Sequence, residues 1–234
     1  MPALNELKRV GHKGADLIAP GNTRASFDAA LDAGVDMIEF DVLAHPEDGR
    51  LVLAHDHSAL AERVPLTLDE GLEHLASSPF ATVELDVDLK LPGYELEVVS
   101  ALAQRGLLDR TLISSQYRES LALIRATEPA VRLGWSVPKL RRDPFRNRLM
   151  RGPMTAVTLA WREALPVRAA GAIRRRECDA LMSHWRLITP RLVRGVRNAG
   201  GELYVWTVDE PDRIRSLRAL GVTGVITNDP RLFD

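Results

Sequence analysis

Extended and helical segments alternate along this chain, and that alternation limits the possible folds more than any other feature. Runs of branched aliphatic residues are repeatedly followed by stretches whose apolar residues recur at helical spacing. We count nine extended segments, at 9–12, 36–42, 51–54, 82–90, 111–114, 131–137, 179–183, 203–208 and 222–227. The third follows the second after only a turn, so we interpret it as an added hairpin strand. The remaining eight, separated mostly by helices, predict a (β/α)8 TIM barrel of the α/β class.

The length of the chain fits one such barrel. With 234 residues it can bury a substantial core, and no low-complexity linker marks a boundary, so we expect a single domain over residues 1–234. The insertion after the second strand is very short, because only residues 57–65 separate His55-Asp56 from Leu66-Thr67. The region 139–177 is ambiguous, because one or two helices and an apolar piece at 155–161 could be assigned there in different ways.

Charge and cysteine content narrow the expected partners and location. The formal net charge of −1 gives no reason to expect nucleic-acid binding, so we expect a small-molecule partner. Cys178 is the single cysteine, which excludes an intrachain disulfide and suits a reducing compartment. The N-terminus lacks the apolar core of a signal peptide, and no apolar run approaches the roughly 20 residues of a spanning helix. These features predict a cytoplasmic protein.

The segment 36–42 places two carboxylates in an otherwise apolar strand. Residues two apart on a strand share a face, so Glu39 and Asp41 point the same way, opposite to the apolar residues that flank them. Two carboxylates this close repel each other, and burial would disfavour their charges. We therefore expect a cation, a basic partner or water to compensate them.

The segment 82–90 alternates apolar and charged residues. One face carries Glu84, Asp86, Asp88 and Lys90, and the other carries valine and leucine. In a barrel the active site is built at the C-terminal ends of the strands. We therefore expect these charges to meet the first carboxylate pair there.

Two histidines, His12 and His55, end two other extended segments. Carboxylates without a cysteine cluster favour a hard cation such as Mg²⁺ or Ca²⁺, although the histidines leave zinc open. An unperturbed imidazole titrates near pH ~6.5, so one histidine can take a proton while the other gives one. A cation and a lysine would neutralise an anion whose charge rises during reaction, which suggests phosphodiester cleavage.

Six short motifs follow one another along the chain. They are His12-Lys13-Gly14, Ala19-Pro20-Gly21-Asn22-Thr23, Glu39-Phe40-Asp41-Val42, His55-Asp56, Asp88-Leu89-Lys90 and Trp206-Thr207-Val208. In residue type, order and spacing they resemble the glycerophosphodiester phosphodiesterase family, over nearly the whole chain.

The resemblance implies a metal-dependent phosphodiesterase that hydrolyses glycerophosphodiesters to an alcohol and sn-glycerol 3-phosphate. It implies that Glu39, Asp41 and Asp88 hold a divalent cation, Mg²⁺ or Ca²⁺. It also implies that His12 and His55 are the catalytic pair, with His12 acting as base or nucleophilic aid and His55 protonating the departing alcohol.

The resemblance further implies that Lys13 and Lys90 bind the phosphate and that Trp206 forms part of an apolar wall around the alcohol. Some residues depart from the family pattern. Lys13 stands where the family usually has arginine, and a lysine lacks the bidentate fork. Gly21 replaces a glutamate, which removes one acidic group. Asp88 replaces a glutamate, and its side chain is shorter.

The third metal ligand and the substrate stay open at this stage. Glu84 and Asp86 share a strand face with Asp88, so either is an alternative ligand. The short insertion predicts an open site, which makes lysophospholipase D-like cleavage of a lipid diester an alternative. The tract 139–151 contains Arg141, Arg142, Arg146, Arg148 and Arg151 among apolar residues, and such a helix can contact an anionic membrane weakly or simply be solvated. A non-catalytic ligand-binding barrel is the third alternative.

Overall fold

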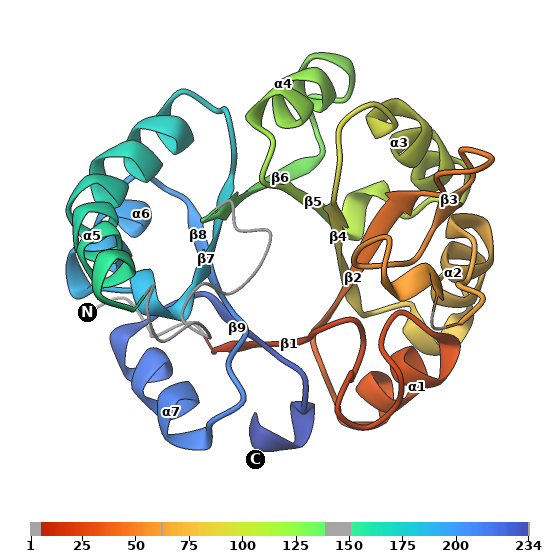
Figure 1. Cartoon of the computed structure of the whole chain (residues 1–234), viewed down its shortest axis with the longest axis horizontal. Helices are drawn as coiled ribbons and strands as arrows, with labels where there is room; N and C mark the ends of the chain where they lie inside the picture. Colours follow the sequence, from red (N-terminus) through yellow and green to blue (C-terminus); the bar gives the residue numbers. More distant parts are fainter. Residues whose placement is uncertain (1–5, 62, 139–150, 234) are drawn as a thin grey trace.

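Eight parallel strands close into a barrel that helices surround (Figure 1). The computed structural model describes residues 6–61, 63–138 and 151–233, with side chains in these ranges except at 151–157. The described strands are β1 (Lys8–Gly11), β2 (Met37–Ala44), β3 (Leu51–Val52), β4 (Glu84–Leu89), β5 (Thr111–Ser115), β6 (Arg132–Val137), β7 (Ala180–His184), β8 (Glu202–Trp206) and β9 (Gly224–Thr227). The order is β1-β9-β8-β7-β6-β5-β4-β2, and β1 pairs with β2 to close the ring. The predicted (β/α)8 barrel is confirmed.

Strand β3 lies outside the ring of parallel strands. It pairs antiparallel with the end of β2, Leu43 opposite Val52 and Ala44 opposite Leu51. The predicted hairpin is therefore present. Because β3 begins opposite Ala44, the last residue of β2, and runs antiparallel to it, the chain turns back alongside β2 before it reaches His55, three residues after β3.

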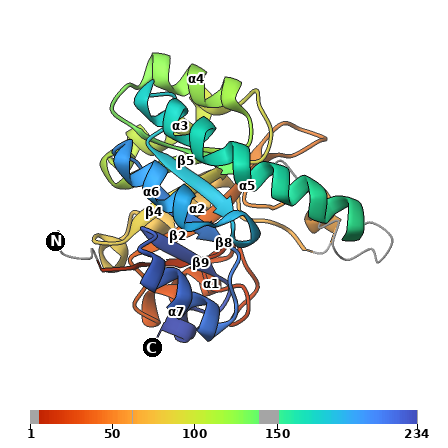
Figure 2. The same cartoon turned by 90° about the vertical axis from the view of Figure 1, so that its left-hand side faces the viewer.

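Helices form the outer layer. The α-helices of the described residues are α1 (Arg24–Asp32), α2 (Leu68–Leu75), α3 (Glu95–Gln104), α4 (Arg118–Thr127), α5 (Arg151–Arg174), α6 (Pro190–Asn198) and α7 (Pro211–Leu220). Short 3₁₀ helices are η1 (Ala59–Ala61), η2 (Ser78–Phe80), η3 (Leu108–Arg110), η5 (Trp185–Leu187) and η6 (Pro230–Phe233). The long helix α5 covers most of the ambiguous region and projects beyond the strands (Figure 2). Among the described residues, no helix has the length and apolar character needed to cross a bilayer.

Two helices begin as local sequence rules require. Thr67 precedes α2, and its hydroxyl accepts a hydrogen bond from the Glu70 N–H while the Glu70 carboxylate accepts one from the Thr67 N–H. Thr23 and Ser26 form the same reciprocal pair at α1. Such capping boxes satisfy donors that the first helical turn leaves unpaired.

The core has two layers, one on each side of the strands. On β4, Leu85, Val87 and Leu89 face outward and pack in the main cluster between strands and helices. A smaller cluster inside the barrel consists of Val10, Met37, Leu112, Ala180, Met182, Tyr204 and Ile226. Because strand residues alternate, Asp86 and Asp88 face the interior. The barrel interior therefore changes from apolar to acidic toward the C-terminal ends of the strands.

Cys178 provides a test of this packing. Its side chain is 2% exposed, and burial, together with the charges of Asp179 and Glu177, raises the pKa of the thiol to about 12. The thiolate is the reactive form, so at pH 8 we expect the folded protein to react with DTNB at least about 100-fold more slowly than the protein in guanidinium chloride. Absorbance of the released thiolate measures both rates. Equal rates would contradict the buried position.

Candidate active site

One cavity at the C-terminal ends of the strands gathers most of the predicted site residues. Its volume is about 160 Å³. The lining includes His12, Glu39, His55, Asp88, Lys90 and Trp206, together with Asp86, Ser114, Gln116, Ser136, Met182, Thr207 and Ile226. The predicted residues Lys13 and Asp41 lie beside it, in contact with lining residues. The barrel therefore joins residues from the ends of β1, β2, β4 and β8 and from the segment after β3.

A larger groove of about 590 Å³ lies on the outside of the barrel, between α4 and α5. Trp135 and Cys178 contribute to its lining, and Arg118 lies over the Trp135 ring. No residue of the predicted site borders it. We therefore assign the candidate site to the smaller cavity, which the predicted histidines, two of the predicted carboxylates and Lys90 line.

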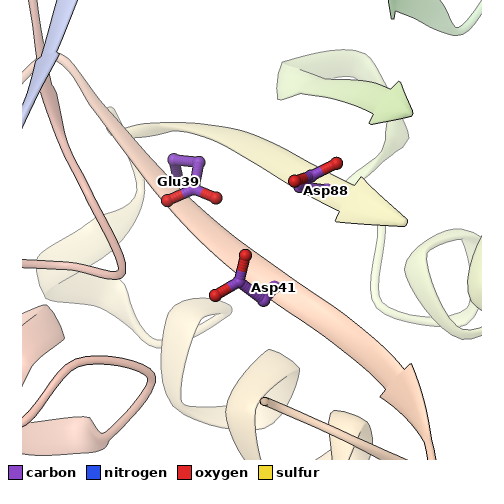
Figure 3. Close-up of side chains that lie close together, drawn as sticks. All are labelled: Glu39, Asp41 and Asp88. Atoms are coloured by element: carbon purple, nitrogen blue, oxygen red, sulfur yellow. The ribbon is translucent and has the colours of Figure 1, made fainter. Parts of the chain in front are cut away.

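Three carboxylates form a compact acidic cluster. Glu39 and Asp41 project from β2 and Asp88 from the neighbouring β4 (Figure 3). One carboxylate oxygen of each lies within 4.8 Å of the others. Glu39 is 5% exposed and Asp41 is fully buried, while one oxygen of Asp88 has no hydrogen-bond partner among the described residues. An all-oxygen donor set of this kind fits a hard divalent cation.

The ammonium group of Lys90 lies between two members of this cluster. Its Nζ is 2.5 Å from Asp41 Oδ1 and 2.5 Å from Asp88 Oδ2. Burial alone would lower the pKa of Lys90, but Asp41 and Asp88 outweigh it and raise the pKa well above its usual value. Burial likewise opposes ionisation of Asp41, yet Lys90 holds the pKa of Asp41 well below its usual range. Lys90 therefore supplies the basic compensation that the carboxylates need.

Glu84, one alternative third ligand, is engaged elsewhere. It lies at the start of β4 and forms ion pairs with Lys8 and Arg132. These partners sit at the opposite end of the strands from the cavity, since Lys8 begins β1 and Arg132 begins β6. Among the acidic residues of β4, the compact cluster contains Asp88.

Asp86, the other alternative, lies deeper in the same cavity. It is 1% exposed, and one of its oxygens has no hydrogen-bond partner among the described residues. Strand pairing places Asp86 beside Glu39, one step below the pair of Asp41 and Asp88. Burial, and next the charge of Asp88, raise the pKa of Asp86 to about 8. Asp86 therefore adds a fourth acidic group that the compact cluster does not include.

Lys13 and Gly21, two departures from the family motif, are linked by Asp16. The Asp16 carboxylate accepts hydrogen bonds from Lys13 Nζ, at 3.1 Å, and from the Gly21 N–H, at 2.8 Å. A Cβ atom on Gly21 would lie 2.4 Å from Asp16 Oδ1, so a residue without a side chain is what allows this arrangement. Asp16 thus places an acidic group beside the basic residue from a different position in the loop.

The loop after β1 is also tied to the acidic cluster. The Lys13 N–H donates to Glu39 Oε2 at 2.8 Å. Asn22 donates through Nδ2 to Asp41 Oδ2 at 2.8 Å and accepts through Oδ1 from the Asp41 N–H at 3.1 Å. Asn22 is recognisable in the sequence only as part of a motif, because a reciprocal bond between residues 19 positions apart has no local signature.

His12 is partly buried at the wall of the cavity, with 19% of its side chain exposed. Its Nδ1 lies 2.5 Å from Asn228 Oδ1, and its Nε2 lies 3.9 Å from Glu39 Oε2. Burial and the charge of Lys13 lower the pKa of His12 to about 4, so the imidazole is neutral near pH 7. Asn228 is not among the predicted site residues, although its position directly after the last strand, as a polar residue, was a usable signal.

His55 occupies a more open position. Half of its side chain is exposed, and its Nδ1 lies 3.0 Å from Asp56 Oδ2. Asp56 also accepts from Ser58, and these bonds hold the pKa of Asp56 well below its usual range. An ionised Asp56 orients the ring of His55, which borders the cavity.

Trp206 forms an apolar wall. Its ring stands edge-on to His184, with centroids 5.1 Å apart. The indole Nε1 is buried without a hydrogen-bond partner among the described residues. The predicted membrane contact of the basic tract 139–151 is not tested, because 139–150 and the Arg151 side chain lie outside the described residues.

Known proteins share both the sequence pattern and the fold. The chain matches the Glycerophosphoryl diester phosphodiesterase family over residues 12–66 and 97–232. A glycerophosphodiester phosphodiesterase from Caldanaerobacter subterraneus is 26% identical, covering 94% of this chain and 93% of its own. A glycerophosphodiester phosphodiesterase structure from Agrobacterium tumefaciens has a TM-score of 0.70 at 20% identity, covering 97% and 99% of the two chains. A phosphodiesterase from Oleispira antarctica, in complex with the product sn-glycerol-3-phosphate, has a TM-score of 0.69 at 22% identity, covering 96% and 94%.

Fold, site and relatives together define a (β/α)8-barrel phosphodiesterase. The chain belongs to the glycerophosphoryl diester phosphodiesterase family, whose model matches well over half of it, and the resemblance seen in its motifs is confirmed. The matched ranges leave out 67–96, the part of the chain that contains Asp88 and Lys90. The position of these two residues in the site therefore rests on geometry.

Asp86 should make stability depend on pH when divalent cations are removed. The unfolded chain releases this proton near pH ~3.9, whereas the folded pKa is about 8, so the folded state holds more protons between these values and loses stability as pH rises. In EDTA we expect the free energy of unfolding to fall between about pH 5 and pH 8, by at most about 1.4 kcal/mol per pH unit from this group. Asp86→Asn should flatten the slope, as urea denaturation would show.

Glu84→Gln is the matched control on the same strand. The pKa of Glu84 is lowered, because its ion pairs outweigh its burial, so it titrates below this pH window. The free energy of unfolding of Glu84→Gln should therefore change with pH as steeply as that of the wild type. An Asp86→Asn protein with the wild-type slope would contradict the assignment to Asp86.

Proposed function

We propose that this protein is a metal-dependent phosphodiesterase that hydrolyses glycerophosphodiesters to an alcohol and sn-glycerol 3-phosphate. The observation that carries the proposal is the shared site, in which three clustered carboxylates lie at one cavity with a neutral, partly buried histidine, an exposed histidine and a lysine. An acidic patch that was merely solvated would not require two histidines and a lysine beside its carboxylates. Membership of the family and the activities named for its relatives support the same reaction.

Glu39, Asp41 and Asp88 are the residues that would hold a divalent cation, Mg²⁺ or Ca²⁺. Their buried oxygens are close enough to share one ion. A bound divalent ion polarises a phosphoryl oxygen and offsets the charge that develops in the transition state. Asn22 fixes the Asp41 carboxylate, and the Lys13 N–H fixes that of Glu39.

His12 and His55 divide the proton transfers in our proposal. His12 is neutral at pH 7 because its pKa is lowered to about 4, so it can accept the proton of the attacking oxygen. His55 borders the same cavity from its solvent side, where a departing alcohol can leave. His55 therefore donates the proton that the leaving oxygen requires.

Lys90, Lys13 and Trp206 are assigned to the substrate. Lys90 borders the cavity with its ammonium group and can neutralise a phosphate oxygen. Lys13 is held by Asp16, and its charge acts on both His12 and Asp41. Trp206 offers an apolar face and an unused indole N–H to the organic part of the substrate.

The size of the cavity favours a small group at the reaction centre. A volume of about 160 Å³ lies below the roughly 300–1,000 Å³ of sites that enclose drug-sized ligands. Glycerol phosphate is a group of this class, and the Oleispira antarctica enzyme was solved with sn-glycerol-3-phosphate. The alcohol would then extend toward the mouth.

Exposed apolar residues near the mouth favour a lysophospholipid as the second candidate substrate. Leu17 is 63% exposed and Val64 is 95% exposed. Their loops meet, because Arg63 donates to the Gly21 carbonyl, and Leu17 donates to the carbonyl of Asn228, the partner of His12. A faster rate on vesicle-bound lysophospholipid than on glycerophosphocholine, lost in Leu17→Ser/Val64→Ser, would favour this substrate.

We further propose that residues 1–234 act as one barrel domain and that the protein works in the cytoplasm. The unbroken strand order supports the first proposal. Limited proteolysis and cell fractionation test the two.

Removal of divalent cations should abolish hydrolysis. We expect glycerophosphocholine turnover to fall by at least about 100-fold in EDTA, because the clustered carboxylates then have no ion to present to the phosphate. Activity should return with excess Mg²⁺ or Ca²⁺, measured by release of sn-glycerol 3-phosphate. Undiminished turnover after exhaustive chelation would remove the cation from the mechanism.

Loss of either histidine should be as severe. His12→Asn and His55→Asn should each lower kcat by about 10²–10⁴-fold, the usual contribution of general acid–base catalysis. His74→Asn is the matched control, since His74 pairs with Asp28 outside the site. Near-normal kcat in either site variant, with circular dichroism like that of the wild type, would disprove the assigned pair.

A further inference from the structure

Asn228 connects the proposed base to a carboxylate that lies outside the predicted site. It follows β9 directly, and its Oδ1 lies 2.5 Å from His12 Nδ1. On its other side, Asn228 donates through Nδ2 to Asp209 Oδ2 at 2.7 Å and through its N–H to Asp209 Oδ1 at 2.9 Å. Thr227 also donates its hydroxyl to Asp209 Oδ1, at 3.0 Å.

These bonds fix which nitrogen of His12 carries the proton. An ionised carboxylate can only accept hydrogen bonds, so Asp209 requires the NH₂ group of the Asn228 amide to face it. The amide oxygen must then face His12. Because an amide oxygen only accepts, Nδ1 of the neutral imidazole must be the donor, and the lone pair must lie on Nε2.

The lone pair therefore lies on the side of the acidic cluster. His12 Nε2 is 3.9 Å from Glu39 Oε2, and both residues line the cavity. The backbone holds this geometry, since the His12 N–H donates to the Thr227 carbonyl at 2.8 Å. His12 follows β1, Asn228 follows β9 and Asp209 follows β8, so three parts of the chain form this series of hydrogen bonds.

We propose that Asp209 and Asn228 are positioning residues that hold His12 in the Nδ1–H tautomer, with Nε2 free to accept a proton. The tautomer assignment stands on the hydrogen bonds alone, whereas its catalytic consequence rests on the proposed role of His12 as base. Oriented partners of this kind commonly select the tautomer of a histidine and so determine which nitrogen reacts.

Asp209→Asn should reverse the selection. With a neutral amide at 209, the Asn228 amide is free to turn its NH₂ group toward His12, which then accepts at Nδ1 and carries its proton on Nε2. We expect kcat to fall by about 10²-fold with KM changed less than about threefold, because the base is in the wrong tautomer but the binding groups are intact. Asn228→Ala should remove the selection and lower kcat to a similar extent.

The exchange variant Asp209→Asn/Asn228→Asp supplies the decisive test. Aspartate at 228 accepts from His12 Nδ1–H and also from the amide of asparagine at 209, so the donor and acceptor pattern of the wild type is restored. We expect the kcat of this double variant to exceed that of Asp209→Asn by at least about tenfold. Asp229→Asn is the control, since Asp229 binds Arg231 rather than His12, and its kcat should equal that of the wild type.

Long-range ¹H–¹⁵N correlation spectra report the tautomer without any substrate. Spectra are recorded in EDTA at pH 8 on the wild type and each variant, with His12→Asn used to assign the resonance among the six histidines. We expect Nδ1–H in the wild type and the exchange variant, and Nε2–H or a mixture in Asp209→Asn and Asn228→Ala.

An Nε2–H signal in the wild type, or an unchanged Nδ1–H signal in both single variants, would overturn the proposal. An exchange variant as inactive as Asp209→Asn, yet folded, would also count against it. If the wild type hydrolyses no phosphodiester, the proposed function fails, but the spectra still decide whether Asp209 and Asn228 select the tautomer.

Discussion

Repulsion among buried carboxylates is the constraint on which the rest of this site depends. Four acidic residues occupy neighbouring positions on two adjacent strands: Glu39, Asp41, Asp86 and Asp88. The most exposed of them is Asp88, whose side chain is 13% exposed. Such a group is costly unless cations compensate it. Lys90 compensates Asp41 and Asp88, while burial leaves the pKa values of Glu39 and Asp86 raised. This residual demand for positive charge is why the cluster fits a divalent cation.

The barrel makes this charge density possible by separating apolar from polar layers. The interior below the site is filled by a small apolar cluster, and the main apolar cluster packs between the outward faces of the barrel strands and the helices. Stability is thus supplied by parts of the fold that the chemistry does not use. The C-terminal strand ends are left to carry groups that would destabilise a core, as in other (β/α)8 enzymes.

The loop after β1 shows how departures from a family motif can be absorbed locally. Considered one residue at a time, Lys13 lacks the bidentate fork of the usual arginine, and Gly21 lacks the carboxylate of the usual glutamate. In the folded loop they form one unit with Asp16, which binds the lysine and fills the space beside the glycine. The acidic group has changed position along the chain while remaining beside the basic one.

Sequence by itself determined the barrel, the hairpin and the capped starts of α1 and α2, because strand and helix periodicity and capping act over a few residues. It also determined that Glu39 shares a face with Asp41 and that His12 and His55 end extended segments, whereas it left Glu84, Asp86 and Asp88 as alternatives for the third carboxylate, with Asp88 favoured by the family resemblance. The tertiary structure alone decided that Glu84 pairs with Lys8 and Arg132, that Asn22 locks Asp41, and that Asn228 faces His12. These contacts join segments that are distant in the chain, 216 positions apart for His12 and Asn228. No local pattern specifies such a pair, because closure of the barrel is what brings β1 and β9 together.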